Sequence, residues 1–187
     1  MAGQSTDTQM ILRHWREAVP NDRLAHLVKD ATRALVRALQ ARLAEHKVSF
    51  GHWAFLRILW ERDGLTQREL SEYAGVMEPT TFSALKAMER LGYVVRRRVG
   101  ADRKKMYVFL TPKGRLLKSE LVPLAESVNN IAIRGVKPTN VKATRAVLLS
   151  IIDNLAKDEA ARNTPMPSTR ALARVQQVRH AERNRTV

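Results

Sequence analysis

Residues 65–117 read LTQRELSEYAGVMEPTTFSALKAMERLGYVVRRRVGADRKKMYVFLTPKGRLL and carry the strongest structural signal in the chain. Thr66 and Glu69 have the spacing of a capping box, so a helix is expected to begin there. Gly75 is expected to end that helix, because glycine tolerates the left-handed backbone of a helix terminus. Pro79 is typical of the first turn of a following helix, where a missing N–H is no loss. The segment therefore predicts two short helices joined by a turn.

The second of these helices has two distinct faces. Phe82, Leu85, Met88 and Gly92 recur at intervals of three and four residues, and this stripe is expected to face the core. The other face offers small hydroxylated side chains for base edges and basic side chains for phosphates. The residues of this helix predicted to contact DNA are Thr80, Thr81, Ser83, Lys86, Ala87 and Arg90. Taken alone, the same face is also compatible with a solvated surface helix.

A basic β-hairpin is expected directly after this helix. Its strands are predicted at 93–95 and 106–110, where residues are β-branched or aromatic. The intervening RRRVGADRKK has six basic residues and one acid, and such charge gives salt-sensitive affinity for DNA. Arg103, oriented by the neighbouring Asp102, is predicted to enter a minor groove, although a merely basic exposed turn is the alternative. The predicted contacts of the hairpin are Arg97, Asp102, Arg103, Lys104 and Lys105.

From about Leu24 to Gly135 the chain resembles the MarR family of winged-helix transcriptional regulators. The resemblance is carried by GHWAFLRILWERDGLTQREL (51–70), GVMEPTTFSALKAMERLGYVVRR (75–97) and ADRKKMYVFLTPKG (101–114). It implies an obligate homodimer that binds a pseudo-palindromic operator in double-stranded DNA and is released by a small ligand. The expected fold class is mostly α with a small β-hairpin wing (α+β), a winged helix–turn–helix plus a helical dimerisation domain.

Composition points in the same direction. A chain of 187 residues suits one domain with extensions, and a formal net charge of +15 indicates a nucleic acid or another anionic partner. There is no cysteine, which excludes disulfides and sensing by thiol oxidation. No run of about eighteen apolar residues and no basic-then-apolar leader pattern is present, so no membrane partner is expected and a cytoplasmic location is the default expectation.

The chain is expected to divide into four parts. Residues 1–20 form an N-terminal extension with a short helix, 48–110 form the winged helix–turn–helix, and 158–187 form a basic tail that is expected to be mobile. Residues 21–47 and 111–157 are predicted to build the dimerisation region, because mutual burial is the simplest cover for their apolar stripes. Packing of these helices within one chain is the alternative. The tail could also contact DNA or a partner subunit.

The resemblance places an effector between the dimerisation helices and the winged helix, around His46 to Trp60. Trp15, His46, His52 and Trp53 are the residues predicted to bind it, and a small aromatic carboxylate is the class that the family implies. Two alternatives compete with this interpretation: Trp53 as an ordinary core residue, and His52 as a surface residue at the start of a helix.

Enzymatic function is not expected. The sequence has no glycine-rich phosphate loop or nucleophile elbow, and its five histidines lack ligand spacing, so neither a cofactor nor a metal is predicted. The sequence therefore predicts a ligand-responsive, sequence-specific DNA-binding regulator, most simply a repressor, acting as a homodimer. The alternatives are a basic architectural DNA-binding protein with little sequence preference and a module that binds an acidic protein partner.

Overall fold

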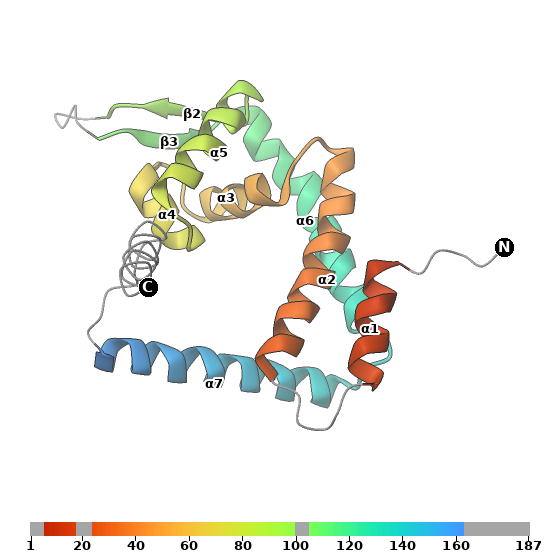
Figure 1. Cartoon of the computed structure of the whole chain (residues 1–187). Coiled ribbons are helices and arrows are strands. Elements are labelled where there is room, and N and C mark those ends of the chain that lie inside the picture. Colours follow the sequence, from red (N-terminus) through yellow and green to blue (C-terminus); the bar gives the residue numbers. More distant parts are fainter. Residues whose placement is uncertain (1–5, 18–23, 100–104, 163–187) are drawn as a thin grey trace, which may run out of the picture. The chain divides into compact units, whose positions relative to one another are not determined.

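The computed structural model describes residues 6–17, 24–99 and 105–162 (Figure 1). Two compact units are distinguished, Met1–Arg134 and Gly135–Val187. The elements are α1 (Asp7–Glu17), α2 (Leu24–Glu45), α3 (Phe50–Glu61), β1 (Leu65–Thr66), α4 (Gln67–Ala74), α5 (Glu78–Arg90), β2 (Val94–Arg97), β3 (Tyr107–Leu110), α6 (Pro112–Ala132) and α7 (Pro138–Arg162). The predicted fold class, mostly α with a small β-hairpin wing, is confirmed.

The three strands form one antiparallel sheet in the order β1-β3-β2. Val94 lies opposite Leu110, and Leu65 lies opposite Val108. The two hairpin strands lie within two residues of their predicted positions, whereas the two-residue strand β1 was not predicted. Buried Val94, Val108 and Leu110 attach the base of the hairpin to the hydrophobic core.

Helix α3 is central to the core of the first unit, where it contacts α2, α4, α5, α6 and β3. Its start is capped by Ser49, whose Oγ accepts a hydrogen bond from the backbone N–H of His52 at 3.1 Å. Phe55, Leu56 and Leu59 are buried on α3. Each such side chain stabilises the fold by roughly 1.5–3 kcal/mol through burial. A shift of α3 would therefore disturb every element that surrounds it.

Asp63, just after α3, joins three elements through its carboxylate. Its Oδ1 accepts hydrogen bonds from the backbone N–H groups of Leu110 at 2.8 Å and Gly64 at 3.1 Å. Its Oδ2 accepts one from the Arg115 guanidinium at 2.6 Å. These bonds hold the end of α3 against β3 and the first turns of α6.

Helix α6 begins in close contact with the strand region. The N-cap residue Thr111 donates its backbone N–H to the Tyr93 carbonyl at 3.0 Å, and the Gly114 carbonyl accepts a hydrogen bond from Trp60 Nε1 at 2.9 Å. Gly114 is buried, and a Cβ at this position would lie 2.1 Å from the Tyr93 oxygen. Glycine is therefore required here for close approach of two backbones. The helix continues through Pro123 without ending.

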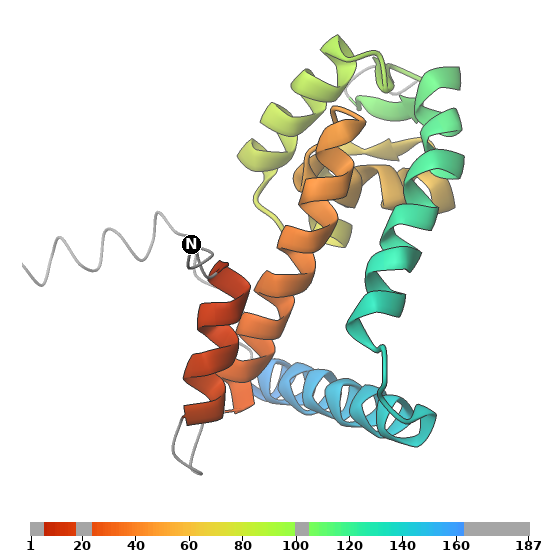
Figure 2. The same ribbon diagram turned by 90° about the vertical axis from the view of Figure 1, so that its right-hand side faces the viewer.

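A helix is present in the predicted N-terminal extension: α1, which lies alongside α2 (Figure 2). Trp15 Nε1 donates to Asp30 Oδ2 at 3.1 Å. Asp7 forms an ion pair with Arg37, and the Arg37 guanidinium holds the pKa of the Asp7 carboxyl below its usual value. Two polar contacts thus attach α1 to α2.

The second unit is described here through α7. None of the residues of this helix is buried, although it carries large apolar side chains, namely Val147, Leu148, Leu149, Ile152 and Leu155. Helix α7 continues to Arg162 and so includes Asp158, where the tail was predicted to begin. An i,i+4 ion pair at 3.0 Å joins these two residues and supports the last turn. The rest of the predicted tail, 163–187, lies outside the described residues.

Candidate DNA-binding surface

The turn between α4 and α5 is built as the sequence predicts. The Glu69 N–H donates to Thr66 Oγ1 at 3.3 Å, and the Thr66 N–H donates to Glu69 Oε2 at 2.7 Å, so the capping box is confirmed. The Thr66 hydroxyl also donates to that carboxylate, and this bond lowers the pKa of Glu69 from its ordinary value. Gly75 then adopts φ 63°, in the left-handed region. This turn redirects the chain into α5.

The buried side of α5 contains Thr81, Leu85 and Met88, each fully buried. The Ser71 hydroxyl of α4 donates to Thr81 Oγ1 at 2.8 Å. Thr81 was predicted to contact DNA, and this is wrong, because its hydroxyl is used to join α4 to α5 and no part of the residue is exposed.

The exposed side of α5 presents polar and basic groups. Thr80, Ser83, Lys86 and Arg90 are exposed, and Ala87 is half-buried. Phe82 was predicted to face the core, but it is 47% exposed and also lies on this side. Thr81 is the residue that continues the buried stripe, because it lies four residues before Leu85, which in turn lies three residues before Met88. Spacing alone does not separate Thr81 from Phe82, because both precede Leu85 at helical intervals of four and three residues.

Arg96 of β2 links the hairpin to α5. Its Nη2 and Nε donate to Glu89 Oε2 at 2.7 and 3.1 Å, and its guanidinium lies 5.6 Å from the centre of the Phe82 ring. The Arg96 guanidinium lowers the pKa of Glu89, so the pair stays ionised at neutral pH. The Arg96 guanidinium is thus engaged in contacts within the protein, whereas Arg97 is exposed at the end of β2.

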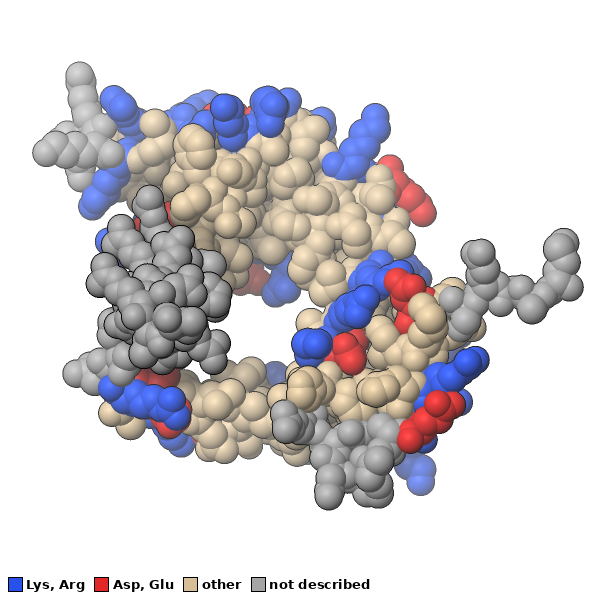
Figure 3. Space-filling view, viewed as in Figure 1, with Lys and Arg blue, Asp and Glu red and all other residues tan. Residues whose placement is uncertain are grey.

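The rest of the predicted hairpin contacts are only partly described. Lys105 is exposed, and its charge contributes to lowering the pKa of Glu69 at the start of α4. Asp102, Arg103 and Lys104 lie outside the described residues. Figure 3 shows Lys and Arg side chains gathered over the hairpin and the adjoining end of α5. This charged edge is complementary to a polyanion.

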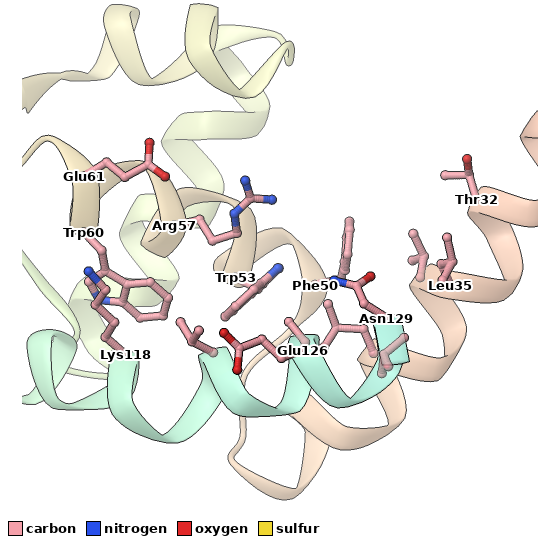
Figure 4. A pocket seen from close by; sticks show the side chains of 15 residues that line it. Thr32, Leu35, Phe50, Trp53, Arg57, Trp60, Glu61, Lys118, Glu126 and Asn129 are labelled. Carbon is pink, nitrogen blue, oxygen red and sulfur yellow. The ribbon is translucent and has the colours of Figure 1, made fainter. Parts of the chain in front are cut away.

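A cavity of about 560 Å³ lies between α2, α3 and α6 (Figure 4), within the size range of small-molecule sites. Trp53 and Trp60 of α3 form part of its wall, with ring centroids 5.6 Å apart and an interplanar angle of 71°. Its charged lining residues are Arg57 and Glu61 of α3 and Lys118 and Glu126 of α6. The cavity thus combines aromatic surface with groups of both charges.

Of the four predicted effector residues, only Trp53 lines this cavity. Trp15 is hydrogen-bonded to α2, and His46 Nδ1 lies 3.2 Å from Glu120 Oε2. His52 is half-buried at the start of α3, where burial lowers its pKa. Trp15, His46 and His52 therefore do not line this cavity.

Sequence reasoning missed Arg57 and Trp60, although the spacing of residues 53, 57 and 60 places them on one side of a helix and could have revealed them. It also missed Lys118 and Glu126, for which no local signal exists. Among residues 6–17, 24–99 and 105–162 no group of three acidic or histidine side chains is placed to hold a metal ion. Over the same ranges, no helix has the length and apolarity needed to cross a membrane.

An exposed helix following a tight turn, with a basic hairpin beside it, defines a winged helix–turn–helix DNA-binding domain. Residues 46–105 match the family model described as MarR family. A relative from Methylorubrum extorquens, the HTH-type transcriptional regulator TtmR, is 31% identical over 156 residues, which cover 81% of this chain and 75% of the relative. The chain belongs to the MarR family of transcriptional regulators.

Two further comparisons agree with this assignment. The crystal structure of transcriptional regulator PA3341 is 32% identical with a TM-score of 0.65, and the match covers 72% of this chain and 99% of that one. The homoprotocatechuate degradative operon repressor of Escherichia coli is 28% identical over 97 residues, or 52% of this chain and 66% of that protein. The family and these relatives are transcriptional regulators, not enzymes.

Proposed function

We propose that this protein is a homodimeric transcriptional repressor that binds a pseudo-palindromic operator in double-stranded DNA and is released by a small aromatic acid. The observation that carries the proposal is the exposed polar and basic side of α5 beside the charged hairpin. Thr80 and Ser83 offer hydroxyls to base edges, and Lys86 and Arg90 offer charges to phosphates. The hairpin, with Arg97, Lys105 and the predicted tip residue Arg103, reaches the adjacent minor groove.

The homodimer is supported by the apolar surface of α7. Val147, Ile152 and Leu155 are all more than half exposed, which is unfavourable for side chains of this kind on a helix in water. In a two-fold symmetric interface, these side chains would be buried against the same surface of a second copy of the chain. We therefore retain 48–110 as the DNA-binding region and assign 21–47 and 111–162 to dimerisation.

The effector site that we propose is the cavity between α2, α3 and α6. Trp53 and Trp60 provide flat surface for an aromatic ring, and Arg57 and Lys118 provide charge for a carboxylate, in spite of the two glutamates in the lining. Helix α3 connects this cavity to the core beneath α4 and α5. A ligand that shifts α3 against α6 would change the separation of the two recognition helices. Such coupling typically amounts to about 1–3 kcal/mol.

Arg57→Gln is expected to raise the concentration of benzoate or hydroxybenzoate needed for half-maximal release of DNA about tenfold, because a charge-assisted hydrogen bond is lost. The measurement is fluorescence anisotropy of labelled operator titrated with the acid. Lys29→Gln removes the same charge from an exposed site of α2 that does not line the cavity, and should behave as the wild type. Equal responses of Arg57→Gln and wild-type protein would exclude this carboxylate contact.

The test of DNA function is a titration of the protein against DNA flanking its own gene, beside random DNA, at near-physiological salt. A repressor is expected to favour one palindrome by about a thousandfold or more. An architectural protein would bind both DNAs with similar, salt-sensitive affinity. If the protein also bound all members of a random-sequence DNA library with equal affinity, the proposal of a sequence-specific repressor would be contradicted.

A further inference from the structure

Phe82 is a large apolar side chain on the exposed side of α5, 47% exposed. Its neighbour Ser83 is also exposed, and Lys86 follows one turn later. Because residues of a helix are rotated by about 100° from one to the next, Lys86 lies between Phe82 and Ser83 around the helix. The ring therefore belongs to the same surface as the polar and basic residues assigned to DNA binding.

The Phe82 ring is held in place from one side. The Arg96 guanidinium lies 5.6 Å from the ring centre, which is cation–π distance. Glu89 in turn fixes Arg96 by accepting hydrogen bonds from Nη2 at 2.7 Å, Nε at 3.1 Å and the backbone N–H at 3.3 Å. A ring oriented before binding loses less conformational entropy when it is buried in an interface.

We propose that Phe82 reads the methyl group of a thymine in the major groove of the operator, a role that rests on the proposed function. Thymine alone among the four bases presents a methyl group there, and an apolar side chain such as phenylalanine recognises it by contact. Lys86, on the same side of the helix, would bring the ring to the groove by pairing with phosphate. Contact between the Phe82 ring and the thymine methyl group would remove apolar surface of both from water, which favours binding.

The experiment begins with selection of the best-bound duplex from a random library by the wild-type protein. Each thymine of that duplex is then replaced by deoxyuracil, which lacks only the methyl group. At one position in each half-site the replacement is expected to weaken wild-type binding about fourfold, the factor that corresponds to burial of one methyl-sized group. Phe82→Ala should weaken binding to the thymine duplex by at least as much and show no uracil penalty at that position.

Two variants control for folding and for general apolar effects. Phe82→Leu keeps an apolar side chain and should retain part of the uracil penalty. Tyr73→Ala removes another exposed aromatic, on α4, whose hydroxyl accepts a hydrogen bond from Arg62 at 2.5 Å, and should leave the penalty unchanged. If the uracil penalty persists in Phe82→Ala, this inference is overturned while the proposed function stands. The same holds if the wild type selects a specific duplex in which no replacement of thymine by deoxyuracil weakens binding. Failure of the wild type to select any sequence overturns the proposed function and this inference together.

Discussion

Replacement of both Lys86 and Arg90 by glutamine is expected to weaken operator binding about a thousandfold at about 0.15 M monovalent salt. Both side chains are exposed on the polar side of α5. A dimer would lose four phosphate contacts, and counterion release at each contact contributes roughly 0.7 log units of affinity at that salt concentration. The slope of log K against log salt should fall in magnitude by about 3.6.

The measurement is a set of binding isotherms on the selected operator at several salt concentrations. A matched control, Arg13→Gln with Arg16→Gln, removes the same charge from two exposed positions of α1. The control should change the salt slope little, since its charges make no phosphate contact in the proposed complex. Equal losses in the two double variants would mean that net charge, and not the surface of α5, determines the affinity.

Gly114→Ala is expected to lower the free energy of unfolding by about 3 kcal/mol or more. The added Cβ would lie 2.1 Å from the Tyr93 carbonyl oxygen and 3.1 Å from Leu110 Cδ2. Backbone must move to relieve such a contact, and the movement would disturb the hydrogen bonds of Thr111 to Tyr93 and of Trp60 to the Gly114 carbonyl. Denaturant unfolding measures the loss, and a fall in Tm on the order of 10 °C should accompany it.

Gly51→Ala is the matched control for this substitution. Gly51 lies in the first turn of α3, where an added Cβ would approach only Ser49 Oγ, at 3.9 Å. Alanine is better than glycine in a helix by roughly 0.5–1 kcal/mol, so this variant should be as stable as the wild type or slightly more stable. A small effect at Gly114, similar to that at Gly51, would contradict the close backbone contact.

Local signals in the sequence were sufficient for the elements around the turn. Two such signals are the capping box of Thr66 and Glu69 and the left-handed Gly75. Each depends on residues within a few positions of one another and not on distant parts of the chain. The strands of the hairpin were likewise predicted to within two residues. The two-residue strand β1 was missed because it exists only through pairing with β3, which lies more than forty residues later.

The two faces of α5 illustrate the limit of periodicity. Thr81 and Phe82 are adjacent, and either could precede the stripe of Leu85 and Met88 at helical spacing. Burial of Thr81 depends on the Ser71 hydroxyl of α4, and exposure of Phe82 leaves its ring beside Arg96 of β2. Neither partner can be identified from the helix itself. The polar Thr81 is therefore buried and the apolar Phe82 is exposed, the reverse of what these residue types usually do.

By itself the sequence determined the start of α4 at its capping box and its end at Gly75, the position and charge of the hairpin and, through its motifs, the MarR family. These features depend on backbone preferences and on charges that act over a few residues. Only the tertiary structure decided which side of α5 is exposed and which side chains line the cavity. The cavity is lined by Trp53 and Arg57 of α3 together with Lys118 and Glu126 of α6, which lie more than sixty residues later in the chain. Such a juxtaposition arises from packing between helices, and no local pattern encodes it.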